Sequence, residues 1–148
     1  MKIMKRVIST VAVLLFTLGM ACAKADQPIK VEELPQAAQT FIKTYFSGAK
    51  ISFAKLDDEF LYKEYEVMLT DGTKLEFNGD GEWENVDCKY GAVPTGIVPA
   101  QIAEYIKKNY PDAKILKIDR DRRDYEVALS NHLELTFDLK FNLVDIDD

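Results

Sequence analysis

Residues 64–77 read EYEVMLTDGTKLEF, and residues 124–137 read DYEVALSNHLELTF. In each stretch apolar and polar side chains alternate, which is typical of β-strands that bury one face. A turn sequence, Asp71-Gly72 in one stretch and Asn131-His132 in the other, separates two alternating runs. The sequence therefore predicts the same pair of antiparallel strands twice, and the rest of the chain can be aligned outward from it.

The similarity continues on the N-terminal side of the two strand pairs. The tripeptide Ala-Lys-Ile at residues 49–51 recurs at residues 113–115, an offset of 64, whereas the strand pairs are offset by 60. The first copy is therefore longer by four residues, and these lie between Asp58 and Lys63. A longer hairpin in the first copy would absorb the difference, so we interpret the chain as a tandem repeat of one structural unit.

Each copy begins with a helix that follows a proline, Pro35 or Pro99, and proline suits the first turn of a helix. Apolar side chains then recur every three or four residues, as in a helix with one buried face. They are Ala38, Phe41, Ile42, Tyr45 and Phe46 in the first copy and Ile102, Tyr105, Ile106 and Tyr110 in the second. Ser47-Gly48 and Pro111-Asp112 end the two helices.

Alternation also predicts the faces of the strands. Two sets of side chains should each share one side of a strand: Ile51, Phe53 and Lys55, and then Tyr65, Val67 and Leu69. A fourth strand, from Trp83 to Val86, follows the glycine-rich turn at residues 78–81. The second copy has Asn131-His132 and residues 138–140 in place of the glycine-containing turns, so we expect longer or less regular hairpins there.

The predicted fold class is α+β: one helix followed by a four-stranded antiparallel meander, present twice. We divide the chain into a first unit at residues 26–90 and a second at residues 91–148, with a Gly- and Pro-containing linker at residues 89–97. A unit of about 60 residues buries only about 60% of its unfolded surface, so the two should pack as one globular domain. They could do so helix against sheet within each unit or as one extended sheet.

Residues 1–25 have the pattern of a secretory signal peptide: a basic start, an apolar run from Val7 to Ala23, and small residues that suit cleavage after Ala23 or Ala25. We therefore expect a periplasmic or secreted protein. A lipoprotein signal is the alternative, because Cys22 follows a small residue, and lipidation at Cys22 would anchor the chain to the outer membrane. We expect the chain to contact a membrane only in that case. Cleavage would leave Cys88 as the one thiol of the mature chain.

Net charge excludes one class of partner. The signal segment holds four basic residues and no acidic one, so its removal takes the net charge from −6 to −10. A mature chain this acidic repels the phosphate backbone of nucleic acids, so we expect no nucleic acid partner.

The helix and strand motifs together resemble the PepSY-like exported proteins of Bacteroidetes. The residues that carry the resemblance are Leu34-Pro35, 48–51, 65–67, 75–77 and 80–82, with 111–115, 125–127 and 135–137 in the second copy. The resemblance covers nearly all of the mature chain. The resemblance implies a fold similar to that of the β-lactamase inhibitor protein, with a concave sheet surface. It also implies a role in inhibiting or regulating peptidases. The family has no catalytic residue that could be assigned to a position of this chain.

Side chains that could carry chemistry are few. Residues 78–82 alternate oxygen ligands with glycine, but Lys89 stands where a calcium loop of the EF-hand type needs glutamate, so we interpret them as a turn. His132 is the one histidine, which we place in a turn, and we expect Cys88 to be a partly buried thiol at a strand end. The sequence predicts no catalytic, cofactor or metal site.

The expected function is that of an exported, non-catalytic module that binds a protein, with inhibition or regulation of a peptidase or another enzyme as its sharper form. A small-ligand or envelope-stress carrier is the alternative. A carboxylate-dependent hydrolase using Glu64 with Glu66, or Asp124 with Glu126, is a third. The candidate binding residues are the outer strand face and an arginine cluster: Glu64, Glu66, Met68, Lys74, Glu76, Asp124, Glu126, Arg120, Arg122 and Arg123.

Overall fold

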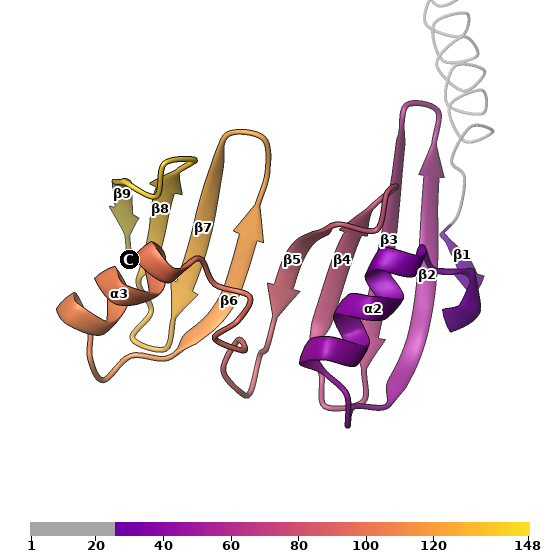
Figure 1. The fold of residues 1–148 in the computed structure, drawn as a ribbon, viewed down its shortest axis with the longest axis horizontal. Coiled ribbons are helices and arrows are strands. Elements are labelled where there is room, and N and C mark those ends of the chain that lie inside the picture. The colour runs from indigo at the N-terminus through magenta and orange to yellow at the C-terminus, as the bar shows by residue number, and fades with distance from the viewer. Residues whose placement is uncertain (1–25) are drawn as a thin grey trace, which may run out of the picture.

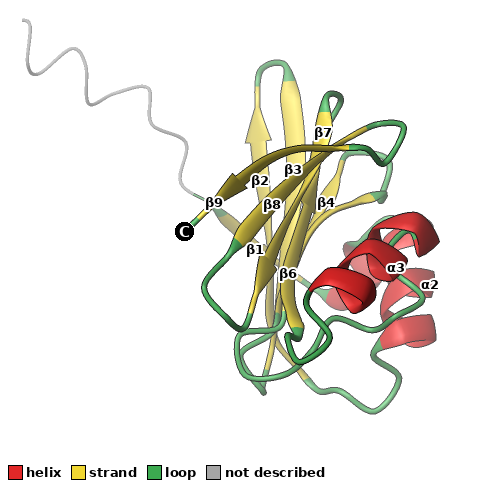
Figure 2. Ribbon diagram, turned by 90° about the vertical axis from the view of Figure 1, so that its left-hand side faces the viewer, coloured by secondary structure: helices red, strands yellow, loops and turns green. Residues whose placement is uncertain are grey.

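The computed structural model describes residues 26–148, so the predicted signal peptide, its cleavage sites and Cys22 lie outside the described residues. Within this range the chain forms one nine-stranded antiparallel sheet in which the strands follow their order in the sequence, β1 to β9. Two helices, α2 and α3, lie on one face of the sheet, and the other face is left open (Figures 1 and 2). This confirms the α+β class. The structure combines the two packings considered, because the two halves of the chain share one extended sheet and each helix packs against strands of its own half.

A helix and four strands follow one another twice in the element order. The first set is α2 (Gln36–Tyr45), β2 (Ile51–Glu59), β3 (Tyr62–Leu69), β4 (Lys74–Asn78) and β5 (Trp83–Asp87). The second set is α3 (Ala100–Asn109), β6 (Ile115–Arg120), β7 (Asp124–Leu129), β8 (Glu134–Asp138) and β9 (Leu143–Asp147). A short strand, β1 (Gln27–Ile29), and a 3-10 turn, η2 (Val31–Glu33), precede the first set.

Both helices use the apolar stripe that the sequence predicts. Ala38 and Ile42 of α2 and Ile102 and Ile106 of α3 are buried against the sheet. The helices also make the same aromatic contact. The ring of Phe41 meets that of Phe77 edge-on at 5.5 Å between centroids, and Tyr105 meets Phe137 in the same way at 5.6 Å. Such T-shaped pairs fix the angle at which a helix crosses the strands beneath it.

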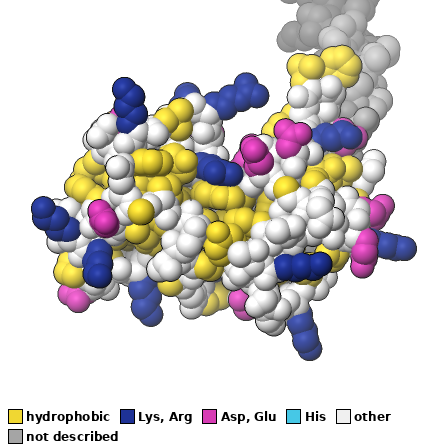
Figure 3. All heavy atoms as spheres, in the orientation of Figure 1, with side chains coloured by type: hydrophobic (Ala, Val, Ile, Leu, Met, Phe, Trp, Pro, Cys, Tyr) yellow, Lys and Arg dark blue, Asp and Glu magenta, His cyan; other side chains and the backbone are white. Residues whose placement is uncertain are grey.

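One apolar core runs under both helices. The segment between the sets contributes to it, since Val93 and Ile97 are buried there. On the helix side, apolar side chains gather across the middle of the surface (Figure 3). No helix within residues 26–148 is long and apolar enough to span a membrane.

The hairpins of the second set are as regular as those of the first, so the expectation of longer or less regular turns is wrong. His132 and Phe141 have left-handed φ values of 72° and 66°, and Gly72 and Gly81 at the equivalent positions have φ values of 90° and 84°. Side-chain oxygens hold the turn between β4 and β5 and the turn between β8 and β9 in the same way. The Asn78 Oδ1 atom accepts hydrogen bonds from two backbone amides at 3.0 Å, and Asp138 Oδ1 does the same at 2.9 Å.

A β-bulge corrects the prediction for β2. Ile51 pairs with Leu69 on the helix side, but the register shifts after it, so Phe53 pairs with Met68 on the open face. Ile51 therefore does not share a side with Phe53 and Lys55. The equivalent strand, β6, carries the same irregularity between Ile115 and Lys117.

The four extra residues lie where the sequence predicts them, in the hairpin between β2 and β3. It is longer than the hairpin between β6 and β7, and its tip exposes Phe60 (98%) and Leu61 (91%). In Figure 1 it rises above the neighbouring strands.

Gly81 offers a test of the contact between α2 and the sheet. Its φ is +84°, and an added Cβ would lie 2.7 Å from the Cβ of Pro35 and 3.0 Å from the amide nitrogen of Ala38. We expect Gly81→Ala to lower the free energy of unfolding by roughly 2 kcal/mol in urea denaturation. The control is Gly48→Ala, whose Cβ would meet nothing within 4 Å. Equal losses in the two variants would contradict the contact.

Candidate functional site

The candidate side chains of β3 and β4 lie on the open face of the sheet. Glu64, Glu66 and Met68 alternate with the inward Tyr65, Val67 and Leu69, while Lys74 and Glu76 alternate with Leu75 and Phe77. Asp124 and Glu126 occupy the same face of β7. Arg122 and Arg123 lie in the hairpin between β6 and β7, whereas Arg120 ends β6 and lines a small hollow together with Glu76, Asp124 and Glu126. The structure therefore divides the ten predicted residues into an open-face group and a hairpin group, and Arg120 borders both.

Strand register places four open-face acids and one asparagine in a line across β3 to β7. Glu66 pairs with Glu76, Glu76 with Asn85, Asn85 with Asp119, and Asp119 with Glu126. We call these five residues the acidic row. Asp119 and Asn85 join the set that sequence reasoning proposed. Their place in the row depends on the pairing of β5 with β6, which the alternation of residues alone does not reveal.

Lysines from the same face partly neutralise the acidic row. The Nζ atom of Lys74 lies 2.6 Å from Glu76, that of Lys117 lies 2.7 Å from Asp119, and that of Lys55 lies 3.5 Å from Glu66. All of these side chains are partly exposed, so each pair contributes at most about 1 kcal/mol. The pairs leave the row acidic but orient its carboxylates.

Asn85 is the buried member of the row, at 4% exposure. Its Nδ2 donates a hydrogen bond to Asp119, while its Oδ1 has no partner among the described residues. A buried amide oxygen without a donor is costly, and such groups occur most often where a ligand or a water completes the site.

Glu64 has the most perturbed carboxyl group on the open face. Partial burial, together with the nearby carboxylates of Glu76, Glu84 and Asp57, raises the pKa of Glu64 from 4.5 to about 7. The hydroxyl of Tyr62 donates a hydrogen bond to Glu64 Oε2. Burial is also the main cause that raises the pKa of Glu84 and that of Glu126. The open face therefore favours any neighbour that brings positive charge.

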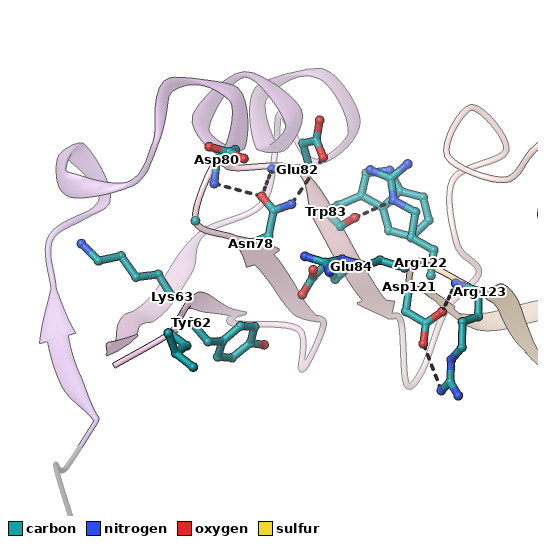
Figure 4. A pocket seen from close by; sticks show the side chains of 13 residues that line it. Tyr62, Lys63, Asn78, Asp80, Glu82, Trp83, Glu84, Asp121, Arg122 and Arg123 are labelled. Carbon is teal, nitrogen blue, oxygen red and sulfur yellow. Dashed lines mark hydrogen bonds and ion pairs between the residues drawn. The ribbon is translucent and has the colours of Figure 1, made fainter. Parts of the chain in front are cut away.

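A groove lies between the two hairpin ends at one edge of this face (Figure 4). It encloses roughly 1040 Å³ and is lined by residues 61–63 of the first hairpin, residues 120–123 of the second, and the turn between β4 and β5. We call it the hairpin groove. One wall carries Leu61 and Tyr62, and the opposite wall carries the arginines, so apolar and cationic surfaces face each other across the groove.

Arg120 is fixed in place, and the other arginines of the wall are exposed. The Nε of Arg120 donates to the backbone oxygen of Trp83 at 2.7 Å, and its guanidinium lies 4.1 Å from the centre of the Trp83 ring. Arg122 and Arg123 are exposed. The backbone amides of Arg123 and Asp124 donate to Asp121, and these hydrogen bonds hold the pKa of Asp121 below its usual range. The wall is thus a rigid loop that presents two exposed guanidinium groups.

The apolar wall of the groove is the feature that sequence reasoning missed. Phe60, Leu61 and Tyr62 form an apolar triplet between the acids of β2 and Lys63. In a hairpin whose turn contains no glycine or proline, such a triplet is easily assigned to a strand interior. Its position inside the four-residue insertion was the available signal that it lies at a tip.

The turn residues lie where the sequence predicts them, whereas Cys88 is more deeply buried than expected. His132 lies in a turn, and Cys88 is a buried thiol next to the end of β5 whose pKa is raised by burial. Residues 78–82 form the turn between β4 and β5, held by Asn78. In the described part of the chain, no group of three or more His, Cys, Asp or Glu side chains is arranged to hold a metal ion.

Comparison with known proteins agrees with this frame of two helices on one long antiparallel sheet. A family model described as "Putative beta-lactamase-inhibitor-like, PepSY-like" matches residues 63–145, which extend from β3 into β9. The chain belongs to this PepSY-like family, as its motifs predict. A search of curated proteins finds no match.

Crystal structures of Bacteroides proteins resemble the chain closely. One, described as "a putative calcium-regulated periplasmic protein" from Bacteroides thetaiotaomicron, is 58% identical with a TM-score of 0.81, over 83% of this chain and 97% of that one. Two from Bacteroides vulgatus, both described as periplasmic, are 53% and 38% identical, with TM-scores of 0.83 and 0.79. They match 85% and 84% of this chain and 99% and 100% of their own. These relatives support a periplasmic location.

Glu64 should make stability depend on pH. Because its pKa in the folded state is about 7, against 4.5 ordinarily, the folded state favours the neutral carboxyl, and the free energy of unfolding should fall as pH rises from 4.5 to 7. We expect Glu64→Gln to remove about 1 kcal/mol of this fall in urea denaturation, after allowing for screening by solvent. The control is Glu104→Gln on the exposed side of α3. Equal pH slopes in the two variants would contradict the assignment.

Proposed function

We propose that this chain is a non-catalytic periplasmic module that binds a protein through the hairpin groove and the adjoining open face. The observation that carries the proposal is the exposed apolar tip of one hairpin facing two exposed arginines of the other. Exposed apolar and aromatic side chains beside arginine are the composition of protein interfaces. Leu61, which lines the groove, is 91% exposed and its neighbour Phe60 is 98% exposed, so the tip carries an apolar patch and not a single exposed apolar side chain.

The contacts of the open-face carboxylates support binding over hydrolysis. Glu66, the partner proposed for Glu64 in a hydrolase, is held by Lys55 at 3.5 Å. Glu64 itself receives the Tyr62 hydroxyl and lies among other acids. A cationic surface would relieve this crowding, so the row fits the role of a docking face for a complementary protein.

The tandem-repeat interpretation belongs to this proposal. The two sets share their buried aromatic contacts, their bulges and their turn hydrogen bonds. They differ at the hairpin tips, where one set exposes apolar residues and the other exposes arginines. A common scaffold with two different tips fits one asymmetric partner better than two equivalent ones. The more specific version of the proposal is that the chain inhibits or regulates a peptidase. The alternative function is that it binds a small ligand in the hairpin groove.

Calcium regulation is a second candidate, favoured by the description of the 58% identical relative. The acidic row supplies oxygen ligands of the kind that calcium takes, including the orphaned Oδ1 of Asn85. At least three of its side chains would have to turn toward one ion, since none of the described acids are grouped for it. Calcium would then act on the face that we assign to the protein partner.

Charge reversal in the groove tests protein binding. Immobilised protein should retain a partner from a Bacteroides periplasmic extract, and Arg122→Glu/Arg123→Glu should reduce the retained amount about tenfold. The matched control, Lys107→Glu/Lys108→Glu, makes the same charge change on the exposed side of α3. The proposal fails if no protein is retained above background, or if the control loses as much. A peptidase panel, assayed with purified protein, tests the inhibitor form.

Calcium titration tests the second candidate. Millimolar calcium should raise the midpoint of thermal unfolding, because an ion that binds the folded state stabilises it, and magnesium should have a smaller effect. Glu76→Gln/Asp119→Asn should abolish the rise, whereas Glu104→Gln should keep it. An unchanged midpoint in the wild-type protein would remove calcium from consideration.

A further inference from the structure

β5 and β9 occupy equivalent places in the two sets but have different surroundings. β5 pairs with β4 on one side and with β6 on the other, whereas β9 pairs with β8 and is the last strand of the sheet. The consequence is visible in burial. Val86 of β5 is 0% exposed, and Ile146, its equivalent in β9, is 43% exposed. Val144 of the same strand and Leu139 of the preceding turn are also exposed.

The pairing of β5 with β6 shows which contacts a neighbouring strand supplies at this position of a set. Val86 lies opposite Ile118, Asp87 opposite Lys117, and the Cys88 amide donates to the Leu116 oxygen at 2.8 Å. β6 therefore places an apolar side chain on the helix side and a lysine on the open face, and its backbone forms hydrogen bonds with the backbone of β5. Among the described residues, no strand pairs with the outer edge of β9, because β9 is the last strand of the sheet.

The charge of β9 selects what could fill this place. Asp145 lies opposite Thr136 and Asp147 opposite Glu134, so both aspartates project from the open face and flank the inward Ile146. A second copy of β9 in antiparallel pairing would set aspartate against aspartate, which is destabilising. A strand with lysine or arginine at these two places and an apolar residue between them would complement the edge in both charge and burial.

We propose that the outer edge of β9 binds an extended segment of another protein whose side chains run basic, apolar, basic. The segment adds a tenth strand, with its apolar residue beside Ile146 and its basic residues opposite Asp145 and Asp147. Edge charges of one sign ordinarily prevent strands from pairing edge to edge. Here they repel acidic strands, including those of this chain, and admit a basic one. The site is separate from the hairpin groove.

The probe is a synthetic peptide, acetyl-Thr-Lys-Ile-Lys-Val-Lys-Thr-amide, titrated into the ¹⁵N-labelled chain. We expect saturable shifts of the amide signals of Leu143–Asp147 and slower hydrogen exchange along β9, which purely electrostatic contact would not produce. A peptide with glutamate in place of each lysine should not bind. Asp145→Lys/Asp147→Lys should weaken binding of the lysine peptide about tenfold.

Two control variants separate binding at β9 from binding elsewhere on the chain. Glu104→Lys/Asp112→Lys makes the same charge change on exposed positions of the helix side and should leave peptide binding unchanged. Arg122→Glu/Arg123→Glu should also leave it unchanged, so failure of the hairpin groove and failure of the β9 edge can be distinguished. Shifts confined to the acidic row, absence of saturable binding, or dimerisation through β9 in sedimentation would each overturn the proposal.

Discussion

The pairing of β5 with β6 is the contact on which the rest of the molecule depends. It is short, with only three registered residue pairs, yet it turns two meanders into one sheet. Val86 and Ile118 meet in this joint and are both fully buried. Each set of a helix and four strands has about the size at which a single core becomes marginal, so the shared core under both helices is what makes the fold stable.

The joint also creates both candidate surfaces. The acidic row is continuous because Asn85 of β5 lies opposite Asp119 of β6, which connects the acids of the first set to those of the second. The hairpin groove has one wall from each set, and Arg120 of β6 reaches across the joint to the ring and backbone of Trp83. A break in this pairing would therefore remove the row and the groove together with the common core.

Much of the fold could be predicted because burial leaves a periodic signal. Positions such as Val67, Leu75 and Phe77 repeat as Val127, Leu135 and Phe137, and all are fully buried. Turn chemistry was harder to predict, because glycine is not what defines these turns. The carbonyl oxygen of the Asn78 side chain and a carboxylate oxygen of Asp138 each accept hydrogen bonds from the backbone amides two and four residues further on. In the second set this cap stabilises Phe141 at a positive φ, in a turn that lacks the glycine of the first set. The bulge in β2 was missed for a similar reason, since one unpaired residue changes the face without changing the composition.

The site could be predicted less well than the fold because it arises from differences between the two sets. Alternation correctly placed Glu64, Glu66 and Glu126 on an outer face, but it could not reveal the exposed apolar tip of the first hairpin or the position of Leu61 across the groove from the arginines. The apolar tip comes from the four-residue insertion, and its position opposite the arginines comes from the pairing of β5 with β6. The charges of the two surfaces also differ: the row is acidic, whereas the arginine wall of the groove is basic and faces the acids Asp80, Glu82 and Glu84 in the same lining. A partner that covers both must present a cationic surface to the sheet and an acidic or apolar one to the groove, which fixes its orientation. This requirement follows from charges that the fold holds at fixed positions, and it is more selective than the net charge of the chain.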